Sequence, residues 1–177
     1  QSLDRVGITS FSDRMGEIFI PERRVSDMYS MFRYLESIEA DGKTAFNKAL
    51  KEYSGKVKRP GTAIVISDMM DAEGFEEGLL SLIYRKFDVV LLQVLAEEEI
   101  SPDLSGSVKL IDSESRESLK VTIDKKFTRL YKSELTSWFE SIEDFCRKKN
   151  IDYIRSGNLI SIEDFLLKYL RQGGMIG

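Results

Sequence analysis

Two acidic residues, Asp68 and Asp71, follow a short apolar segment at residues 62–67. The segment is rich in Ile and Val and comes after Pro60 and Gly61, a pattern that predicts a fully buried strand of a parallel sheet. In open α/β sheets, ligands bind just beyond the carboxyl ends of the strands. Paired carboxylates there could hold magnesium for hydrolysis or phosphoryl transfer. The equally simple alternative is that Asp68 or Asp71 caps the helix that follows.

A second polar group, Gly42-Lys43-Thr44, precedes an amphipathic segment. These residues match the last three positions of the phosphate-binding loop motif. That motif also needs a glycine five residues before Gly42 and a strand that leads into the loop. Position 37 is serine and the preceding pattern is helical, so we interpret the group as a helix start that Thr44 caps. The Thr44 hydroxyl and the Asp68 carboxylate could instead meet at one sheet edge. With waters, they would suit a hard cation such as magnesium.

Composition excludes several classes of function. The 177 residues include no histidine, which excludes Ser-His-Asp and Cys-His catalysis and His-ligated zinc. Cys146 is the one cysteine, so no internal disulfide can form, and we expect a reducing, cytoplasmic location. The net charge is −4 with dispersed basic residues, which argues against nucleic acid as a partner. No apolar run is long enough to predict a membrane span, and no signal peptide is visible.

The apolar periodicity predicts a single domain, residues 1–177, with alternating strands and helices. We expect a three-layer α/β sandwich with a mostly parallel sheet, helices on both faces and a β-hairpin extension at 107–123. The expected strands are 6–11, 17–20, 62–67, 89–95, 108–111, 119–123 and 152–155, and the expected helices are 26–40, 44–55, 75–83, 124–149 and 161–170. The first two strands should pair as a hairpin or edge pair.

The order of these elements resembles a von Willebrand factor A-like domain and, more narrowly, the DUF58 family. The resemblance covers nearly the whole chain. The segments that carry it are Asp4-Arg-Val-Gly-Ile-Thr-Ser-Phe-Ser-Asp13, Asp41-Gly-Lys-Thr44, Ile66-Ser-Asp68 and Asp88-Val-Val-Leu-Leu-Gln-Val-Leu95. Relative to that family, the chain looks like the carboxyl-terminal portion of a domain, with the first strand and its Asp-x-Ser-x-Ser loop upstream of Gln1.

The resemblance implies a metal-ion-dependent adhesion site, in which three loops share one Mg²⁺ or Mn²⁺ ion. Thr44 would match the threonine of the second loop and Asp68 the aspartate of the third, and Asp71 would support the site or cap a helix. Lys43 stands where relatives tend to have glycine, and its ammonium could repel a cation. The string 103–107, Asp-Leu-Ser-Gly-Ser, fits the letters of the first loop but falls in a connecting loop, and we interpret it as coincidence.

By this resemblance we expect a non-enzymatic protein-interaction domain that acts in complex assembly alongside a MoxR-type AAA+ ATPase. The alternative is a magnesium-dependent hydrolase that uses Asp68 and Asp71, and a third reading is a structural domain with no site. A sheet without its first strand would expose a pairing slot. We therefore also expect strand exchange in a homo-oligomer, a partner chain, or an upstream segment to fill the slot.

Overall fold

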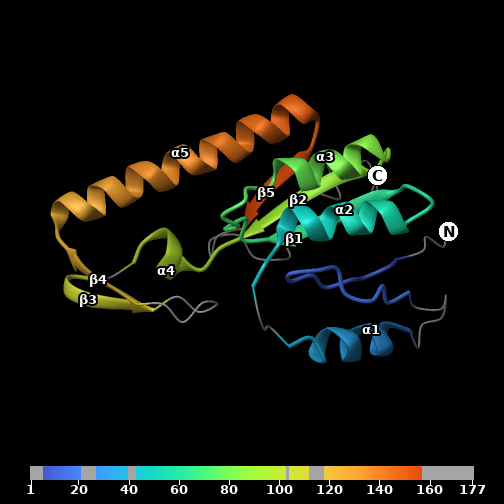
Figure 1. Cartoon of the computed structure of the whole chain (residues 1–177), viewed down its shortest axis with the longest axis horizontal. Coiled ribbons are helices and arrows are strands. Elements are labelled where there is room, and N and C mark those ends of the chain that lie inside the picture. Colours follow the sequence, from blue (N-terminus) through green and yellow to red (C-terminus); the bar gives the residue numbers. More distant parts are fainter. Residues whose placement is uncertain (1–5, 21–26, 40–42, 103, 112–117, 157–177) are drawn as a thin grey trace, which may run out of the picture. The chain divides into compact units, whose positions relative to one another are not determined.

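The computed structural model describes residues 6–20, 27–39, 43–102, 104–111 and 118–156 (Figure 1). The chain divides into two compact units. The first comprises Gln1–Gly61, Met69–Asp88 and Ile111–Glu117, and the second comprises Thr62–Asp68, Val89–Leu110 and Ser118–Gly177. The expected helix at 161–170 lies outside the described residues.

A parallel sheet forms the centre of the second unit. Its strands β1 (Thr62–Ser67), β2 (Asp88–Val94) and β5 (Asp152–Ser156) lie in the order β1-β2-β5. β2 and β5 pair in parallel, from Val90 opposite Asp152 to Val94 opposite Ser156. A separate antiparallel hairpin consists of β3 (Gly106–Ile111) and β4 (Ser118–Ile123). The predicted α/β class, with a mostly parallel sheet and a hairpin extension, is confirmed.

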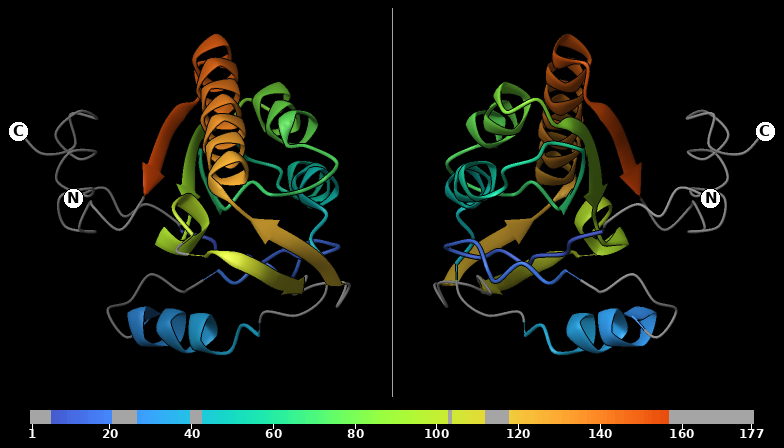
Figure 2. Two further views of the ribbon diagram at one scale, coloured as in Figure 1. Left: turned by 90° about the vertical axis from the view of Figure 1, so that its left-hand side faces the viewer. Right: turned by 90° about the vertical axis from the view of Figure 1, so that its right-hand side faces the viewer.

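Helix α5 (Lys125–Lys149) contacts β5 and β4 and lies alongside the sheet, as Figure 2 shows. It begins where the Asp124 side chain accepts a 2.7 Å hydrogen bond from the backbone N–H of Phe127. It ends at Asn150, whose left-handed backbone lets the Ile151 N–H reach the carbonyl of Cys146. Both limits agree with the prediction from sequence. The short helix α4 (Glu97–Ile100) accepts a hydrogen bond from the Tyr131 hydroxyl through the carbonyl of Glu99.

Strand β1 departs from its predicted full burial. Ala63 and Val65 are buried, but Ile64 is 61% exposed and Ile66 is 58% exposed. β1 is an edge strand, and one of its faces is left uncovered by the described residues. The apolar run therefore reflects strand formation, and it does not by itself show that both faces are covered.

In the first unit, α2 (Phe46–Lys56) and α3 (Glu76–Tyr84) pack against each other. Their shared core includes the fully buried residues Phe46, Leu79 and Leu82. The helices approach closely at Gly78, where a Cβ atom would come within 3.1 Å of the backbone of Asn47. A side chain at position 78 would therefore require α2 or α3 to shift by a few tenths of an ångström.

The amino-terminal segments pair less extensively than predicted. Ile8 and Phe19 exchange two backbone hydrogen bonds of 2.8 and 2.7 Å, but this is an isolated antiparallel bridge instead of two full strands. Helix α1 (Asp27–Glu36) packs through Tyr34, which stacks on Phe19 with ring centroids 4.9 Å apart. Phe32 and Leu35 of α1 and Ile38 after it are 39–51% exposed.

Candidate functional site

Asp68 is an exposed residue directly after the carboxyl end of β1. The next residue, Met69, has a backbone φ of 67° and a side chain that is only 2% exposed. A left-handed conformation costs a residue with a Cβ atom about 1–2 kcal/mol, so surrounding packing must hold it in place. Strained backbone of this kind concentrates at binding and catalytic sites. The turn at Asp68 and Met69 is therefore a candidate site on geometric grounds.

A buried hydrogen-bond network holds the backbone of this turn in place. The side chain of Gln93 in β2 is fully buried, and its Nε2 donates a 3.0 Å bond to the backbone carbonyl of Asp68. The hydroxyl of Tyr153 in β5 donates to Oε1 of the same amide. Burial raises the pKa of Tyr153 to about 12, so its hydroxyl keeps its proton and remains a donor at neutral pH. The network links all three strands of the sheet to the backbone of Asp68.

Asp71 caps a helix, but not the one predicted. Its Oδ2 accepts a 2.7 Å bond from the backbone N–H of Phe46, the first residue of α2, and its Oδ1 accepts a 2.8 Å bond from Glu73 N–H. The predicted cap of α3 is wrong, because α3 begins after Phe75 without a side-chain cap from Asp71. The predicted Thr44 cap of α2 is also wrong. The N-cap residue is Ala45, so a remote carboxylate supplies the acceptor instead.

Asn47 is a structural residue that the sequence reasoning missed. Its side chain is buried, and its Nδ2 donates to the carbonyls of Glu73 and Gly74 at 3.1 and 3.0 Å. Its Oδ1 accepts a 2.7 Å bond from the N–H of Gly78. One amide thus ties α2 to the loop before α3 and to α3 itself. One feature of the sequence could have indicated this burial: Asn47 is an amide residue next to Phe46, on the apolar side of an amphipathic helix.

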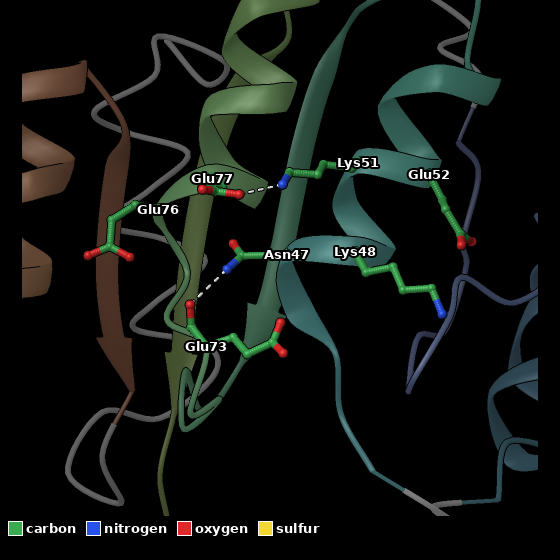
Figure 3. Close-up of a pocket in the computed structure, with 7 residues that line it drawn as sticks. All are labelled: Asn47, Lys48, Lys51, Glu52, Glu73, Glu76 and Glu77. Atoms are coloured by element: carbon green, nitrogen blue, oxygen red, sulfur yellow. Dashed lines mark hydrogen bonds and ion pairs between the residues drawn. The ribbon is translucent and has the colours of Figure 1, made fainter.

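An open groove of about 610 Å³ lies between α2 and the start of α3 (Figure 3). Its lining is mostly charged and consists of Asn47, Lys48, Lys51, Glu52, Glu73, Glu76 and Glu77. Several of these groups already have partners in the protein. Lys51 pairs with Glu77, Glu52 accepts from the N–H of Met15, and Glu76 accepts from the N–H of Phe75. The Lys51–Glu77 pair joins α2 to α3, and the other two contacts hold backbone N–H groups, so most charged groups of the groove already have partners.

The predicted metal ligands are oxygen donors of the kind that Mg²⁺ and Mn²⁺ prefer. Thr44 is exposed and belongs to the first unit, whereas Asp68 belongs to the second. Among the residues that the structure describes, no group of three or more His, Cys, Asp or Glu side chains could hold a metal ion. The oxygen donors of Thr44 and Asp68 fit magnesium, but its coordination shell would need further oxygens from water or a binding partner. That Thr44 and Asp68 bind one ion stays a prediction.

Five residues of the sequence motifs lie outside the described residues. They are Asp4, Arg5, Asp41, Gly42 and Asp103, the last of which opens the Asp-x-Ser-x-Ser string. Gly106 of that string begins β3.

Comparison with known proteins identifies the family. The family model described as "Protein of unknown function DUF58" matches residues 1–137. The chain belongs to the DUF58 family. No curated protein matches this DUF58 chain.

Two solved structures are similar to the DUF58 chain. One is the conserved hypothetical protein BatB from Bacteroides thetaiotaomicron, with 16% identity, a TM-score of 0.53, and coverage of 99% of this chain and 82% of that one. The other is an aerotolerance-related membrane protein from Bacteroides fragilis NCTC 9343 carrying multiple mutations to serine, with 18% identity, a TM-score of 0.47, and coverage of 97% and 79%. At these identities the BatB likeness shows the fold alone. In the described part of this chain, no helix has both the length and the apolar character to cross a membrane.

Proposed function

We propose that this DUF58 chain is a non-enzymatic protein-interaction domain whose binding edge is the turn after β1. The observation that carries the proposal is the strained turn at Asp68 and Met69, held by the buried amide of Gln93. An exposed aspartate whose backbone is held at the carboxyl end of a parallel strand is placed to meet a ligand or partner. Since the chain has no histidine, it also lacks the usual general base at neutral pH.

The proposal includes a divalent cation, Mg²⁺ or Mn²⁺, with the Asp68 carboxylate as its ligand in the turn after β1. Water or oxygens of a binding partner would complete the coordination shell. Such an ion would strengthen a contact with a partner carboxylate by bridging two anionic groups.

The hydrolase alternative, with Asp68 and Asp71 as a metal-binding pair, is less well supported. Both carboxylate oxygens of Asp71 accept short backbone hydrogen bonds, from Phe46 and from Glu73. Binding a metal through Asp71 would disrupt a helix cap that contributes about 1 kcal/mol or more. We therefore assign Asp71 to stabilising α2 and do not propose a catalytic pair.

The partner that we propose is a MoxR-type AAA+ ATPase, with a role for the domain in complex assembly. This choice rests on the DUF58 membership and is a fold-level association. The geometry supports only the position of the contact, at the edge of the sheet that carries Asp68.

Calorimetric titration with Mg²⁺ and with Mn²⁺ tests the ion. Wild type and Asp68→Ala should be compared with Asp88→Ala, which removes an exposed carboxylate at the opposite, amino end of β2. We expect binding by wild type and Asp88→Ala and none by Asp68→Ala. Equal binding by all three proteins would show that the ion does not sit at Asp68. Phosphatase and nuclease screens should stay negative, and a metal-dependent activity lost in both Asp68→Ala and Asp71→Ala would restore the hydrolase alternative.

A further inference from the structure

Gln93 is the one polar side chain among the buried positions of β2. A buried amide destabilises the fold unless it is hydrogen-bonded, so an apolar side chain of similar size would suit this position better on burial alone. Both ends of the Gln93 amide are hydrogen-bonded. Its Nε2 donates to the carbonyl of Asp68, and its Oε1 accepts from the hydroxyl of Tyr153. The amide is therefore explained by the groups that it holds, and one of them is the backbone of the turn after β1.

The two hydrogen bonds also fix the direction of the amide. A backbone carbonyl can only accept, so the amide must turn Nε2 toward Asp68. Its Oε1 then faces Tyr153, whose hydroxyl can donate. All three residues belong to the second unit, with Asp68 after β1, Gln93 in β2 and Tyr153 in β5. The network therefore holds the Asp68 carbonyl in one orientation relative to the sheet.

The orientation of that carbonyl is linked to the strained backbone of Met69. The carbonyl belongs to the planar peptide group that joins Asp68 to Met69, so turning it changes the backbone angles on both sides. A hydrogen bond that holds the carbonyl therefore restrains the φ of Met69, which is 67°. Without this restraint, a residue with a Cβ atom favours negative φ. The backbone would then relax, and the Met69 side chain would leave its buried position.

We propose that Gln93 is a positioning residue, which holds the peptide group between Asp68 and Met69 in the conformation that binds the ion or partner. Gln93 is fully buried, so it acts through the backbone of the turn and does not touch the ligand. Its role in binding rests on the proposed function, whereas its hold on the turn rests on the hydrogen bonds alone. Loss of the amide should release this one turn and leave the rest of the sheet folded.

Methionine oxidation by hydrogen peroxide, located by tandem mass spectrometry, tests the hold on the turn. Met69 is 2% exposed, and its neighbour Met70 is 46% exposed. Met15 is also buried but lies in the first unit, so it reports general unfolding. In the wild type, Met70 should oxidise while Met69 and Met15 stay protected. Gln93→Leu should speed the oxidation of Met69 at least about fivefold and leave Met15 protected.

Val90→Ala is the matched control, because Val90 is buried in the same strand on the face opposite to Gln93. Its truncation destabilises the sheet without removing a bond of the network, so Met69 should stay protected. Met69 that stays protected in Gln93→Leu, or that oxidises equally fast in Val90→Ala, would overturn the proposal. If Gln93→Leu does not fold, Gln93→Met takes its place under the same criteria, since the flexible methionine side chain adapts to irregular space.

Calorimetric titration with Mn²⁺ tests the link between the turn and binding. We expect Gln93→Leu to raise the dissociation constant for Mn²⁺ at least about fivefold, and Val90→Ala to bind as the wild type does. Wild-type affinity in Gln93→Leu would overturn the positioning role. A wild type that binds no Mn²⁺ would contradict the ion of the proposed function instead, and the oxidation of Met69 would then decide by itself whether Gln93 holds the turn.

Discussion

The buried amide of Gln93 should be among the most sensitive positions of the sheet. Tyr153→Phe removes the hydroxyl that donates to Gln93 Oε1, and it leaves the ring in place. A buried acceptor deprived of its donor costs about 1–3 kcal/mol, and we expect a loss of unfolding free energy in that range. Gln93→Leu, of similar size, removes both bonds of the network and should cost about 2–4 kcal/mol.

The double variant Gln93→Leu, Tyr153→Phe carries the sharper prediction. Once Gln93 is replaced, the Tyr153 hydroxyl has no amide oxygen to donate to. Its removal should then lower the unfolding free energy by little more. The two losses should therefore sum to more than the loss in the double variant, by about 0.5–3 kcal/mol of coupling. Urea unfolding followed by circular dichroism measures all four proteins, and the denaturant dependence should stay unchanged between them.

The exposed Tyr84 provides the control for this cycle, since Tyr84→Phe changes the same atom at a position that is 76% exposed. It should shift the unfolding free energy by no more than about 0.5 kcal/mol. The reasoning is refuted if Tyr153→Phe behaves like Tyr84→Phe, or if the losses at Gln93 and Tyr153 simply add.

Three further predictions concern the first unit and alkaline pH. Asp71→Ala should lower the unfolding free energy by about 1–2 kcal/mol through loss of the α2 cap, and an unchanged urea midpoint would contradict the cap. Asn47→Ala should cost about 2–4 kcal/mol because three backbone groups lose their partner. Asn47→Asp should cost at least as much, because it sets a buried carboxylate oxygen against the carbonyls of Glu73 and Gly74; a smaller loss in Asn47→Asp than in Asn47→Ala would contradict the two donated bonds. Burial raises the pKa of Cys146 and of Tyr153 to about 12, above their ordinary values of 9.0 and 10.0, so the folded chain holds protons that the unfolded chain releases. Stability should therefore be full below about pH 9 and fall as the pH rises toward 12, and urea midpoints in Tyr153→Phe should fall less steeply above pH 10 than in wild type.

Elements with a long or strongly periodic pattern could be predicted from the sequence. The 25-residue α5 shows its apolar stripe, its capping Asp124 and its terminal Asn150 within one continuous segment. The cores of β1, β2 and β5 were predicted for similar reasons, because local β-branched runs between turn residues specify strands. These features depend on neighbours in the sequence, which a single sequence displays.

Features that depend on distant segments could not be predicted. The cap that Asp71 provides to α2 joins residues 25 positions apart, so the nearest helix, α3, seemed the natural recipient. The burial of Asn47 depends on a close approach at Gly78 that no local pattern reveals. The exposure of Ile64 and Ile66 depends on which elements cover β1, and an apolar run does not say whether one face or two are covered.

The position of Asp68 in the fold could be predicted from the sequence, and its role as a site stays a prediction. Asp68 follows the carboxyl end of β1 as the general rule for parallel sheets predicts. The strain at Met69 and the support from Gln93 became visible only with the fold, because both are properties of backbone geometry and long-range pairing.

The most direct test of the proposed function is the affinity of this chain for a MoxR-type AAA+ ATPase of the same organism, measured in magnesium. Biolayer interferometry should compare wild type with Asp68→Ala and with the control Asp88→Ala. The proposal predicts that Asp68→Ala raises the dissociation constant at least about tenfold, while Asp88→Ala binds as wild type does. Wild-type affinity in Asp68→Ala, or equal losses in both variants, would contradict a binding edge centred on Asp68.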